Sequence, residues 1–276
     1  MRNAKSVVDN YNGFQYVRYY QSQTALFTKV VSFKQTKQKK FNLNTNVMKK
    51  FIMKIPLIGN LSKQIYRTVI QPQAFKTSGE YWEKRYRSGG NSGAGSYNNL
   101  AEFKGEIINL FIDNKKIDSV IEFGCGDGNQ LKYLRPQRYL GYDISEKAIQ
   151  LCSEIYKKDD TKSFKNTNSY NSEKADLTMS LDVIYHLIEK QTYLNYMNTL
   201  FDASNKYVII YSSNTDYNML NAAHVKNRKF TDWVEKNRQD FSLFEHIPNK
   251  YPFDGDGTQT SFSDFFLYEK IALKTN

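Results

Sequence analysis

The sequence predicts an α/β fold with a mostly parallel sheet and helices on both of its faces. Short apolar runs of strand length alternate with segments of helical periodicity between residues 119 and 211, a pattern typical of parallel sheets. Two strand-like runs then follow each other at 241–246 and 262–270, which predicts an antiparallel pair at the end of the sheet. The composition, 40% apolar and 24% charged, fits a globular domain and excludes collagen-like and mostly disordered chains.

The individual elements follow from periodicity and from capping residues. We expect a short helical stretch around 81–86, a glycine-rich loop at 89–95 and a helix from about residue 98. Ser145 is a suitable N-cap for a helix at 145–156. The remaining expected elements are strands at 119–123, 139–142, 177–181 and 207–211, helices beginning at 130 and 191, and a polar helical region before the last two strands.

Cysteine content and hydropathy restrict the cellular compartment. Cys125 and Cys152 are the only cysteines, too few for the disulfide framework of a small secreted domain, and no Cys/His spacing matches a zinc site. No apolar run of about 18 residues and no signal-peptide pattern occur. We therefore expect a cytoplasmic chain without a metal site.

The positive charge is concentrated at the front of the chain. Residues 1–100 hold 17 Lys and Arg against 3 Asp and Glu, whereas residues 101–276 hold 22 against 25. We expect residues 1–47 to be a poorly ordered basic extension, residues 48–75 to be a basic amphipathic segment, and residues 76–276 to form the α/β domain. Met48 resembles a natural start, which leaves open whether residues 1–47 derive from an upstream reading frame.

The segment 48–70 mixes lysines with Ile, Leu and Phe, and Pro56 and Gly59 divide it into two expected short helices. Such a segment can lie in the interface of an anionic membrane. The alternative is that its apolar residues pack on the domain that follows. The first interpretation predicts a peripheral position on the inner face of a membrane.

The motif that carries most information about function is Glu122-Phe123-Gly124-Cys125-Gly126-Asp127-Gly128. It follows a predicted strand and precedes a predicted helix, where glycines allow the backbone to approach a ligand closely. Asp143 ends the next strand about 20 residues later, a position from which a carboxylate can accept both hydroxyls of a ribose. The alternative is an ordinary strand-to-helix turn and a carboxylate at a helix start.

This region resembles the class I S-adenosylmethionine-dependent methyltransferases, in the segments IEFGCGDGNQLKYL, YLGYDIS and ADLTMSLDVIYHL. The resemblance implies a Rossmann-like, seven-stranded sheet with an antiparallel last strand, and S-adenosylmethionine as the cofactor. It also implies cofactor-binding roles: the three glycines lie beneath the methionine part, Glu122 orders their turn, Asp143 binds the ribose and Ile144 packs on the adenine. The other cofactor-binding positions are Leu181 and Asn168, the latter standing where many members have an acidic residue.

Upstream aromatic and basic residues resemble an element that precedes the glycine motif in many small-molecule methyltransferases. Arg85 could pair with the carboxylate of the cofactor while Tyr81, Trp82 or Tyr86 closes over it. The alternative is that the aromatic residues belong to the core and that Arg85 is a surface charge. The glycine-rich loop at 89–95 is either a lid or a flexible connector.

Asp182 and His186 follow the fourth predicted strand, at the sheet edge where ligands bind in open α/β folds. Either could act as a base toward the methyl acceptor. The alternative is that Asp182 caps the next helix and His186 packs beneath it. The Asn/Asp-Pro-Pro-aromatic motif of amino-methyltransferases is missing, and the Asp-x-x-x-His pattern looks more like enzymes that methylate sugars, lipids and other small molecules.

These observations predict a methyltransferase for a small-molecule or glycan/lipid-linked acceptor. The basic N-terminal region leaves an RNA or DNA methyltransferase as a rival, which the charge balance of residues 101–276 disfavours. A methyltransferase-like domain without catalytic activity is the third alternative. A degenerate glycine turn would be expected in that case, and the turn here is intact.

Overall fold

The computed structural model describes residues 5–11, 14–21, 25–28, 75–218 and 222–272. The chain divides into two compact units, Met1–Gln71 and Pro72–Asn276. The predicted amphipathic segment 48–70 lies outside the described residues. Among the helices that the structure describes, none is long and apolar enough to cross a membrane.

The first unit contains regular structure that we did not predict. Strands β1 (Lys5–Tyr11), β2 (Phe14–Gln21) and β3 (Ala25–Thr28) pair antiparallel in that order. These three strands lie within the extension expected at 1–47, and their pairing is not part of that expectation. Val, Tyr and Phe favour strands, and the Asn12-Gly13 pair between two runs of these residues is a hairpin signal in the sequence. Composition alone does not reveal this signal.

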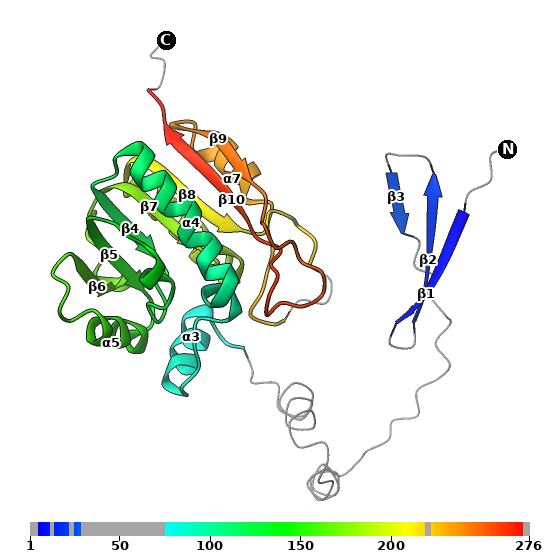
Figure 1. The fold of residues 1–276 in the computed structure, drawn as a ribbon, viewed down its shortest axis with the longest axis horizontal. Coiled ribbons are helices and arrows are strands. Elements are labelled where there is room, and N and C mark those ends of the chain that lie inside the picture. Colours follow the sequence, from blue (N-terminus) through cyan, green and yellow to red (C-terminus); the bar gives the residue numbers. More distant parts are fainter. Residues whose placement is uncertain (1–4, 12–13, 22–24, 29–74, 219–221, 273–276) are drawn as a thin grey trace, which may run out of the picture. The chain divides into compact units, whose positions relative to one another are not determined.

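The second unit is a seven-stranded sheet in the order β6-β5-β4-β7-β8-β10-β9 (Figure 1). Every neighbouring pair from β6 to β8 is parallel, and β10 runs antiparallel to both β8 and β9. The predicted Rossmann-like sheet with an antiparallel last strand is confirmed. Its strands are β4 (Ser119–Phe123), β5 (Arg138–Asp143), β6 (Lys162–Asn166), β7 (Ala175–Leu181), β8 (Ser204–Ser212), β9 (Phe241–Ile247) and β10 (Asp264–Lys270).

Helices cover both faces of this sheet, and α4 crosses one of them in front of β7 and β8 (Figure 1). Successive side chains of β8 point to opposite faces of the sheet. Ile209 therefore packs in the core beneath α4 and α5, and Ile210 packs in the core beneath α6 and α7. The α-helices are α3 (Ser78–Arg87), α4 (Asn98–Lys115), α5 (Glu146–Ile155), α6 (Lys190–Asp202) and α7 (Phe230–Asn237). Ser145 caps α5 as predicted, because its side chain accepts a hydrogen bond from the Ala148 N–H.

Two local predictions differ from the structure. The helix expected from Gln130 is only a short 3-10 turn, η3 (Gln130–Tyr133), because Pro136 follows too closely for a longer helix. Strand β6 was not located from its own sequence. It is an edge strand whose only large apolar residue is Phe164, and its exposed positions, Ser163 and Lys165, are polar, so its sequence gives no apolar signal.

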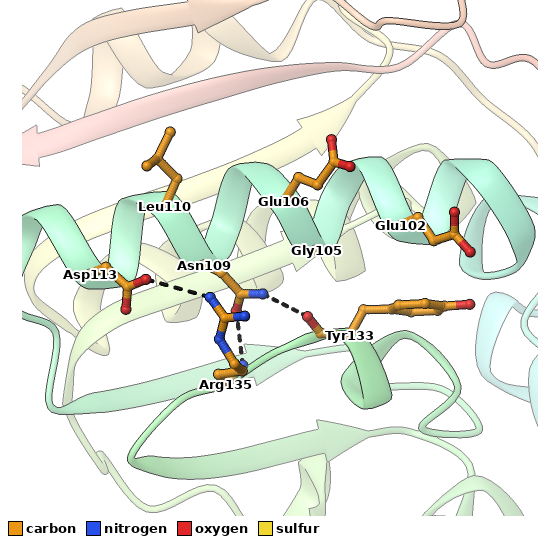
Figure 2. Close-up of a pocket in the computed structure, with 8 residues that line it drawn as sticks. All are labelled: Glu102, Gly105, Glu106, Asn109, Leu110, Asp113, Tyr133 and Arg135. Atoms are coloured by element: carbon orange, nitrogen blue, oxygen red, sulfur yellow. Dashed lines mark hydrogen bonds and ion pairs between the residues drawn. The ribbon is translucent and has the colours of Figure 1, made fainter.

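The outer face of α4 packs against the segment around η3. Asn109 donates to the Tyr133 carbonyl and accepts from the Arg135 N–H, at 2.8 and 2.9 Å, and Asp113 pairs with Arg135 (Figure 2). These residues line a surface hollow that contains none of the predicted site residues. We therefore interpret this hollow as a packing feature that fixes α4 against the sheet.

The sheet order places a functional crevice between β4 and β7. The chain proceeds from β4 outward through β5 to β6, then returns to the other side of β4 to form β7 and β8. Ligands of open α/β sheets bind at such a switch point, beyond the carboxyl ends of the strands. The glycine turn follows β4 and Asp182 follows β7, so both predicted motifs meet at this crevice.

Candidate active site

A cavity of about 470 Å³ lies at the carboxyl ends of β4, β5 and β7. Most of the predicted site residues line this one cavity, although they are spread over more than 60 positions of the sequence. Tyr81, Arg85 and Gly128 do not line it. The predicted residues that do are Glu122, Gly124, Gly126, Asp143, Ile144, Asn168, Leu181, Asp182 and His186.

The glycine turn is held by β5 and has no space for side chains. The N–H groups of Gly124 and Cys125 donate to the Tyr142 carbonyl, and the Gly126 N–H donates to Asp143 at 2.9 Å. Gly124 and Gly126 have φ of 91° and 58°, and a Cβ on Gly126 would lie 2.3 Å from the Ser92 Oγ. Only glycine fits these two positions without strain.

Gly128 has a different role from the one implied by the resemblance. A Cβ at this position would lie 3.0 Å from the Cys152 Sγ on α5. The Gly128 carbonyl accepts a hydrogen bond from the Tyr156 hydroxyl at 2.9 Å. Gly128 therefore allows α5 to pack closely against the turn and does not itself face the cavity.

Asp143 is buried at the end of β5 and joins the turn to helix α5. Its two oxygens accept from the N–H groups of Gly126 and Ser145, both at 2.9 Å. Burial raises the pKa of Asp143 to about 6, although both N–H donors oppose that rise. A carboxylate oxygen can accept more than one hydrogen bond, so Asp143 retains capacity for further donors.

Glu122 is buried, and its carboxylate bonds to β5 and not directly to the glycine turn. Its carboxylate accepts from the Tyr139 hydroxyl at 2.6 Å, and the hydrogen bonds that hold the turn come from β5 and from Asp143. Burial raises the pKa of Glu122 to about 7, with the Tyr139 hydroxyl and the charge of Lys104 acting in the opposite direction. Glu122 is thus a carboxyl group in the cavity wall that can be ionised or neutral near neutral pH.

The Ile144 side chain is exposed in the cavity, and the Asn168 side chain has no hydrogen bond to any described residue. Ile144 is 42% exposed although it is aliphatic and lines the cavity. The Asn168 side-chain amide makes no hydrogen bond with any residue that the structure describes, and only its backbone N–H is bonded, to Asn166. Both side chains are therefore available to a ligand.

Helix α3 lies beside the cavity because its first residue and its middle are tied to different elements. The Ser78 hydroxyl donates to the His186 carbonyl at 2.6 Å, and Glu83 accepts from the Ser145 hydroxyl at 2.6 Å. These bonds bring Trp82 and Tyr86 to the cavity wall. The predicted aromatic element therefore lies at the site, with part of it buried.

Arg85 fastens the glycine-rich loop. Its Nε donates to the Asn91 carbonyl at 2.6 Å, and its guanidinium lies 5.4 Å from the Trp82 ring centroid. Within the described ranges it has no acidic partner. Tyr81 stacks on His224 with ring centroids 4.4 Å apart, and so it also lies outside the cavity wall.

The loop at 88–97 is docked on the glycine turn. Ser92 and Asp127 bond reciprocally, through the Ser92 N–H to the Asp127 carboxylate at 2.9 Å and the Asp127 N–H to the Ser92 Oγ at 3.0 Å. The Tyr97 hydroxyl also donates to Asp127, at 2.8 Å. Of the two predicted roles, these contacts favour a lid over the cavity rather than a free connector.

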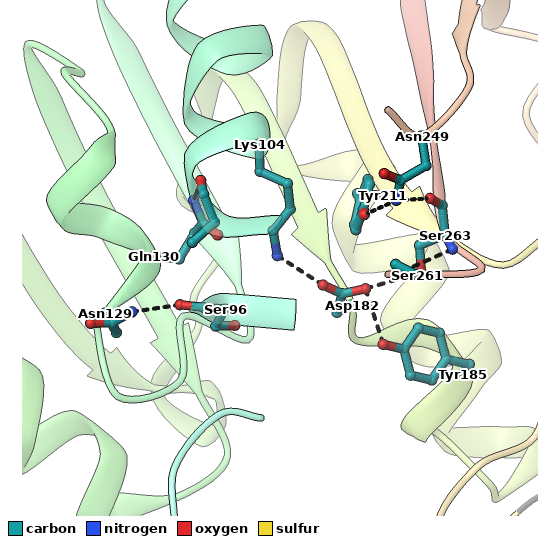
Figure 3. Close-up of polar contacts among 11 residues, drawn as sticks. Ser96, Lys104, Asn129, Gln130, Asp182, Tyr185, Tyr211, Asn249, Ser261 and Ser263 are labelled. Carbon is teal, nitrogen blue, oxygen red and sulfur yellow. Dashed lines mark hydrogen bonds and ion pairs between the residues drawn. The ribbon is translucent and has the colours of Figure 1, made fainter. Parts of the chain in front are cut away.

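A buried lysine that sequence reasoning missed is paired with Asp182 (Figure 3). The Lys104 side chain is 0% exposed, and its Nζ lies 2.8 Å from the Asp182 Oδ2. The other oxygen of Asp182 accepts from the Tyr185 and Ser263 hydroxyls, both at 3.0 Å. An isolated lysine within an apolar helix pattern gives no sequence signal for such a pair.

Asp182 also has an unusual backbone conformation. Its φ is +60°, in the left-handed region that non-glycine residues adopt at a cost. Its N–H donates to the Tyr211 carbonyl at 2.9 Å, and a Cβ on Gly95 would lie 2.7 Å from its carboxylate. The backbone and the carboxylate of Asp182 are thus both held by neighbouring elements, while the residue still lines the cavity.

One ring nitrogen of His186 is hydrogen-bonded and fixes the ring, and the other has no partner among the described residues. Its Nδ1 lies 2.9 Å from the His224 carbonyl and must donate to it, because a carbonyl only accepts. The Nε2 atom then carries the lone pair, and it has no hydrogen-bond partner among the described residues. Burial lowers the pKa of His186 to about 4, so the ring is neutral at physiological pH.

We expect Lys104→Met to destabilise the fold by about 3–5 kcal/mol, because it leaves the Asp182 charge buried without its cation. Urea unfolding monitored by circular dichroism measures the loss. The double variant Lys104→Met/Asp182→Asn should recover most of this stability. Equal stability of the single variant and the wild type would show that the ion pair contributes nothing.

We expect His186 to be the Nδ1-protonated neutral tautomer at pH 7 and to remain neutral until the pH approaches 4. Long-range ¹H–¹⁵N NMR spectra of the imidazole groups distinguish the two tautomers and follow protonation. His246, whose ring is on the surface, provides a reference in the same sample. A proton on Nε2 at pH 7 would contradict the orientation described here.

Comparison with known proteins agrees with the fold. The N-methyltransferase NodS from Bradyrhizobium japonicum WM9, in complex with S-adenosyl-l-homocysteine, has a TM-score of 0.54 at 13% identity, over 71% of this chain and 99% of that chain. Magnesium protoporphyrin IX methyltransferase (ChlM) from Synechocystis PCC 6803, with bound SAH, has a TM-score of 0.50 at 14% identity, over 74% of this chain and 100% of that chain. The small RNA methyltransferase HEN1 has a TM-score of 0.49 at 17% identity, over 63% of this chain and 26% of that chain.

A search of curated proteins found no match. A family model described as a methyltransferase domain matches residues 97–252, more than half of the chain. This range includes the glycine turn, Asp143, Asp182 and His186. The chain therefore belongs to the methyltransferase domain family, and the prediction of an S-adenosylmethionine-dependent methyltransferase is confirmed.

Proposed function

We propose that the cavity binds S-adenosylmethionine and that the methyl group passes to a small organic acceptor held at His186. The observation that carries this proposal is the meeting of the glycine turn, Asp143 and His186 in one cavity. The cofactor supplies a methyl group on a positively charged sulfur. The acceptor gains a bond from oxygen or nitrogen to that carbon as the carbon–sulfur bond breaks.

The residues of the cavity fit the adenosine part of this cofactor. Asp143 is buried and can still accept hydroxyl donors, as a ribose requires. Exposed Ile144 offers an apolar surface to the adenine. The free amide of Asn168 can accept from the adenine amino group and donate to the adjacent ring nitrogen, so an asparagine serves here as well as an acidic residue.

The contacts of Arg85 and Tyr81 do not support the predicted roles in cofactor binding. Arg85 is engaged with Asn91, and neither residue lines the cavity. We propose instead that Arg85 positions the loop at 88–97 over the glycine turn. The residues available near the methionine part of the cofactor are then Ser92, Tyr86 and the turn itself.

We propose His186, and not Asp182, as the group that accepts a hydrogen bond from the acceptor. The negative charge of Asp182 is offset by Lys104, and its oxygens are occupied by three donors. The Nε2 of His186 is free and its ring is fixed by the His224 carbonyl. A neutral imidazole can orient an O–H or N–H group and take its proton as the methyl group is transferred.

The test of the proposed site is the pH dependence of S-adenosylhomocysteine binding. Ribose hydroxyls donate more strongly to an ionised carboxylate than to the neutral acid, so we expect full affinity above the Asp143 pKa of about 6 and weaker binding as the pH falls below it. Calorimetric titration measures the affinity. Asp143→Ala should cost about 1–3 kcal/mol at pH 7.5 and remove this pH dependence.

Asp113→Ala is the matched control, since Asp113 is a carboxylate on the outer face of α4, outside this cavity (Figure 2). Its binding curve should equal that of the wild type. If the Asp143 variant bound as tightly as the wild type at every pH, the ribose site would be elsewhere.

We also propose that residues 48–70 hold the protein at an anionic membrane surface, on the evidence of their basic amphipathic sequence. The full chain should float with vesicles that contain phosphatidylserine, and the triple variant Lys49→Glu/Lys50→Glu/Lys54→Glu should not, because each lysine contributes about 1 kcal/mol near such a surface. Vesicles of phosphatidylcholine alone are the control. Equal flotation of both forms would exclude this attachment.

A further inference from the structure

A row of aromatic rings leads from the cavity to the surface. It consists of Trp82, His186, Tyr185, Phe262 and Phe253, and we call it the aromatic row. Successive ring centroids lie 4.8, 4.5, 5.4 and 6.2 Å apart. Trp82 and His186 line the cavity, so the row begins where the acceptor is proposed to bind.

The outer end of the row is exposed although its loop is well anchored. Phe253 and Phe262 are 53% and 49% exposed. The Ser261 N–H donates to the Tyr251 carbonyl at 2.9 Å, and the Asn99 amide donates to the Gln259 carbonyl at 2.8 Å. The two phenylalanine rings are therefore held outward by a fastened loop.

This loop lies beyond the part of the chain that the family model matches, which ends at residue 252. The cofactor-binding residues, in contrast, all lie inside the matched range or just before it. The outer end of the aromatic row therefore lies on the loop between β9 and β10, apart from the residues that line the cavity. A feature of this kind is better placed to recognise an acceptor than to bind the shared cofactor.

Ring geometry and charge limit the chemistry of a ligand on the row. Three of its contacts are edge to face, with interplanar angles of 75°, 68° and 69°, the arrangement that a further aromatic ring can extend. Asp254 and Asp256 are exposed beside Phe253, and neither forms an ion pair within the described part of the chain. Their charges would repel a phosphate-bearing ligand.

We propose that the aromatic row binds the ring of an uncharged aromatic acceptor, with the nucleophilic oxygen or nitrogen of that acceptor at His186. This proposal rests on the proposed function and names its class of substrate. It favours an aromatic small molecule over the sugar and lipid-linked acceptors that the sequence leaves open. Those two classes are outcomes of the test below.

The test uses the full chain labelled with 5-fluorotryptophan and saturated with S-adenosylhomocysteine. The chain has two tryptophans: Trp82 belongs to the row, and Trp233 packs on the core at Phe201 and Tyr193. Addition of 2-naphthol should shift the ¹⁹F signal of Trp82 and leave that of Trp233 unchanged. The variant Trp82→Phe assigns the two signals.

Phe262→Ala should weaken 2-naphthol binding about three- to tenfold, which is the contribution of one aromatic contact. Phe244→Ala is the matched control, since Phe244 is 38% exposed and packs on Phe111 and Tyr207, outside the row. Its affinity for 2-naphthol should not change. Both variants should bind S-adenosylhomocysteine as the wild type does.

Several results would overturn the proposal. If 2-naphthol left the Trp82 signal unchanged, or bound Phe262→Ala as tightly as the wild type, the row would not be an aromatic subsite. A sugar or lipid-linked acceptor would be indicated instead if methyl α-D-glucopyranoside or dodecyl phosphate shifted the ¹⁹F signal of Trp82 and 2-naphthol did not. That shift would have to disappear in the Phe262→Ala variant. Failure of S-adenosylhomocysteine to bind the wild type would instead refute the proposed function, on which this inference rests.

Discussion

The buried ion pair between Lys104 and Asp182 connects the elements that form the crevice. Lys104 belongs to α4, Asp182 ends β7, and the partners of Asp182 come from η5 (Ile184–His186) and from the residue before β10. A fully buried lysine must keep its counterion, because an unpaired charge in the interior is strongly destabilising. The pair therefore fixes the distance between the helix and the strand ends, and with it the position of His186 four residues later.

Two buried carboxyl groups line the cavity beside the glycine turn. They belong to Glu122 and Asp143, and burial raises the pKa of both. Lys104 is the cation that opposes the charge of Glu122. A cofactor with a positively charged sulfur and an amino group would lower the cost of keeping these carboxylates ionised. Loss of the sulfur charge on methyl transfer would remove part of that stabilisation, which favours release of the product.

The sequence predicts those parts of the molecule in which local chemistry determines local structure. The β4 strand, the Ser145 cap and the glycine turn each have a signal of their own, and they appear as expected. Strand β6 and Lys104 have no such signal, because their environment is formed by elements distant in sequence. The hydrogen-bond partner of Glu122 has no sequence signal for the same reason, since Tyr139 is 17 positions away on β5.

Asp182 and His186 show how geometry separates two candidates that the sequence leaves equal. Both follow β7, both line the cavity, and both carry a group that can accept a proton. Three donors surround the carboxylate, whereas one carbonyl orients the imidazole and leaves its Nε2 unbonded in the described residues. A carboxylate that holds a buried lysine and two hydroxyls positions its neighbours, whereas the unbonded Nε2 of a fixed imidazole can contact a substrate. We therefore propose His186 rather than Asp182 as the group that contacts the acceptor, because Asp182 holds Lys104 while the Nε2 of His186 stays unbonded among the described residues.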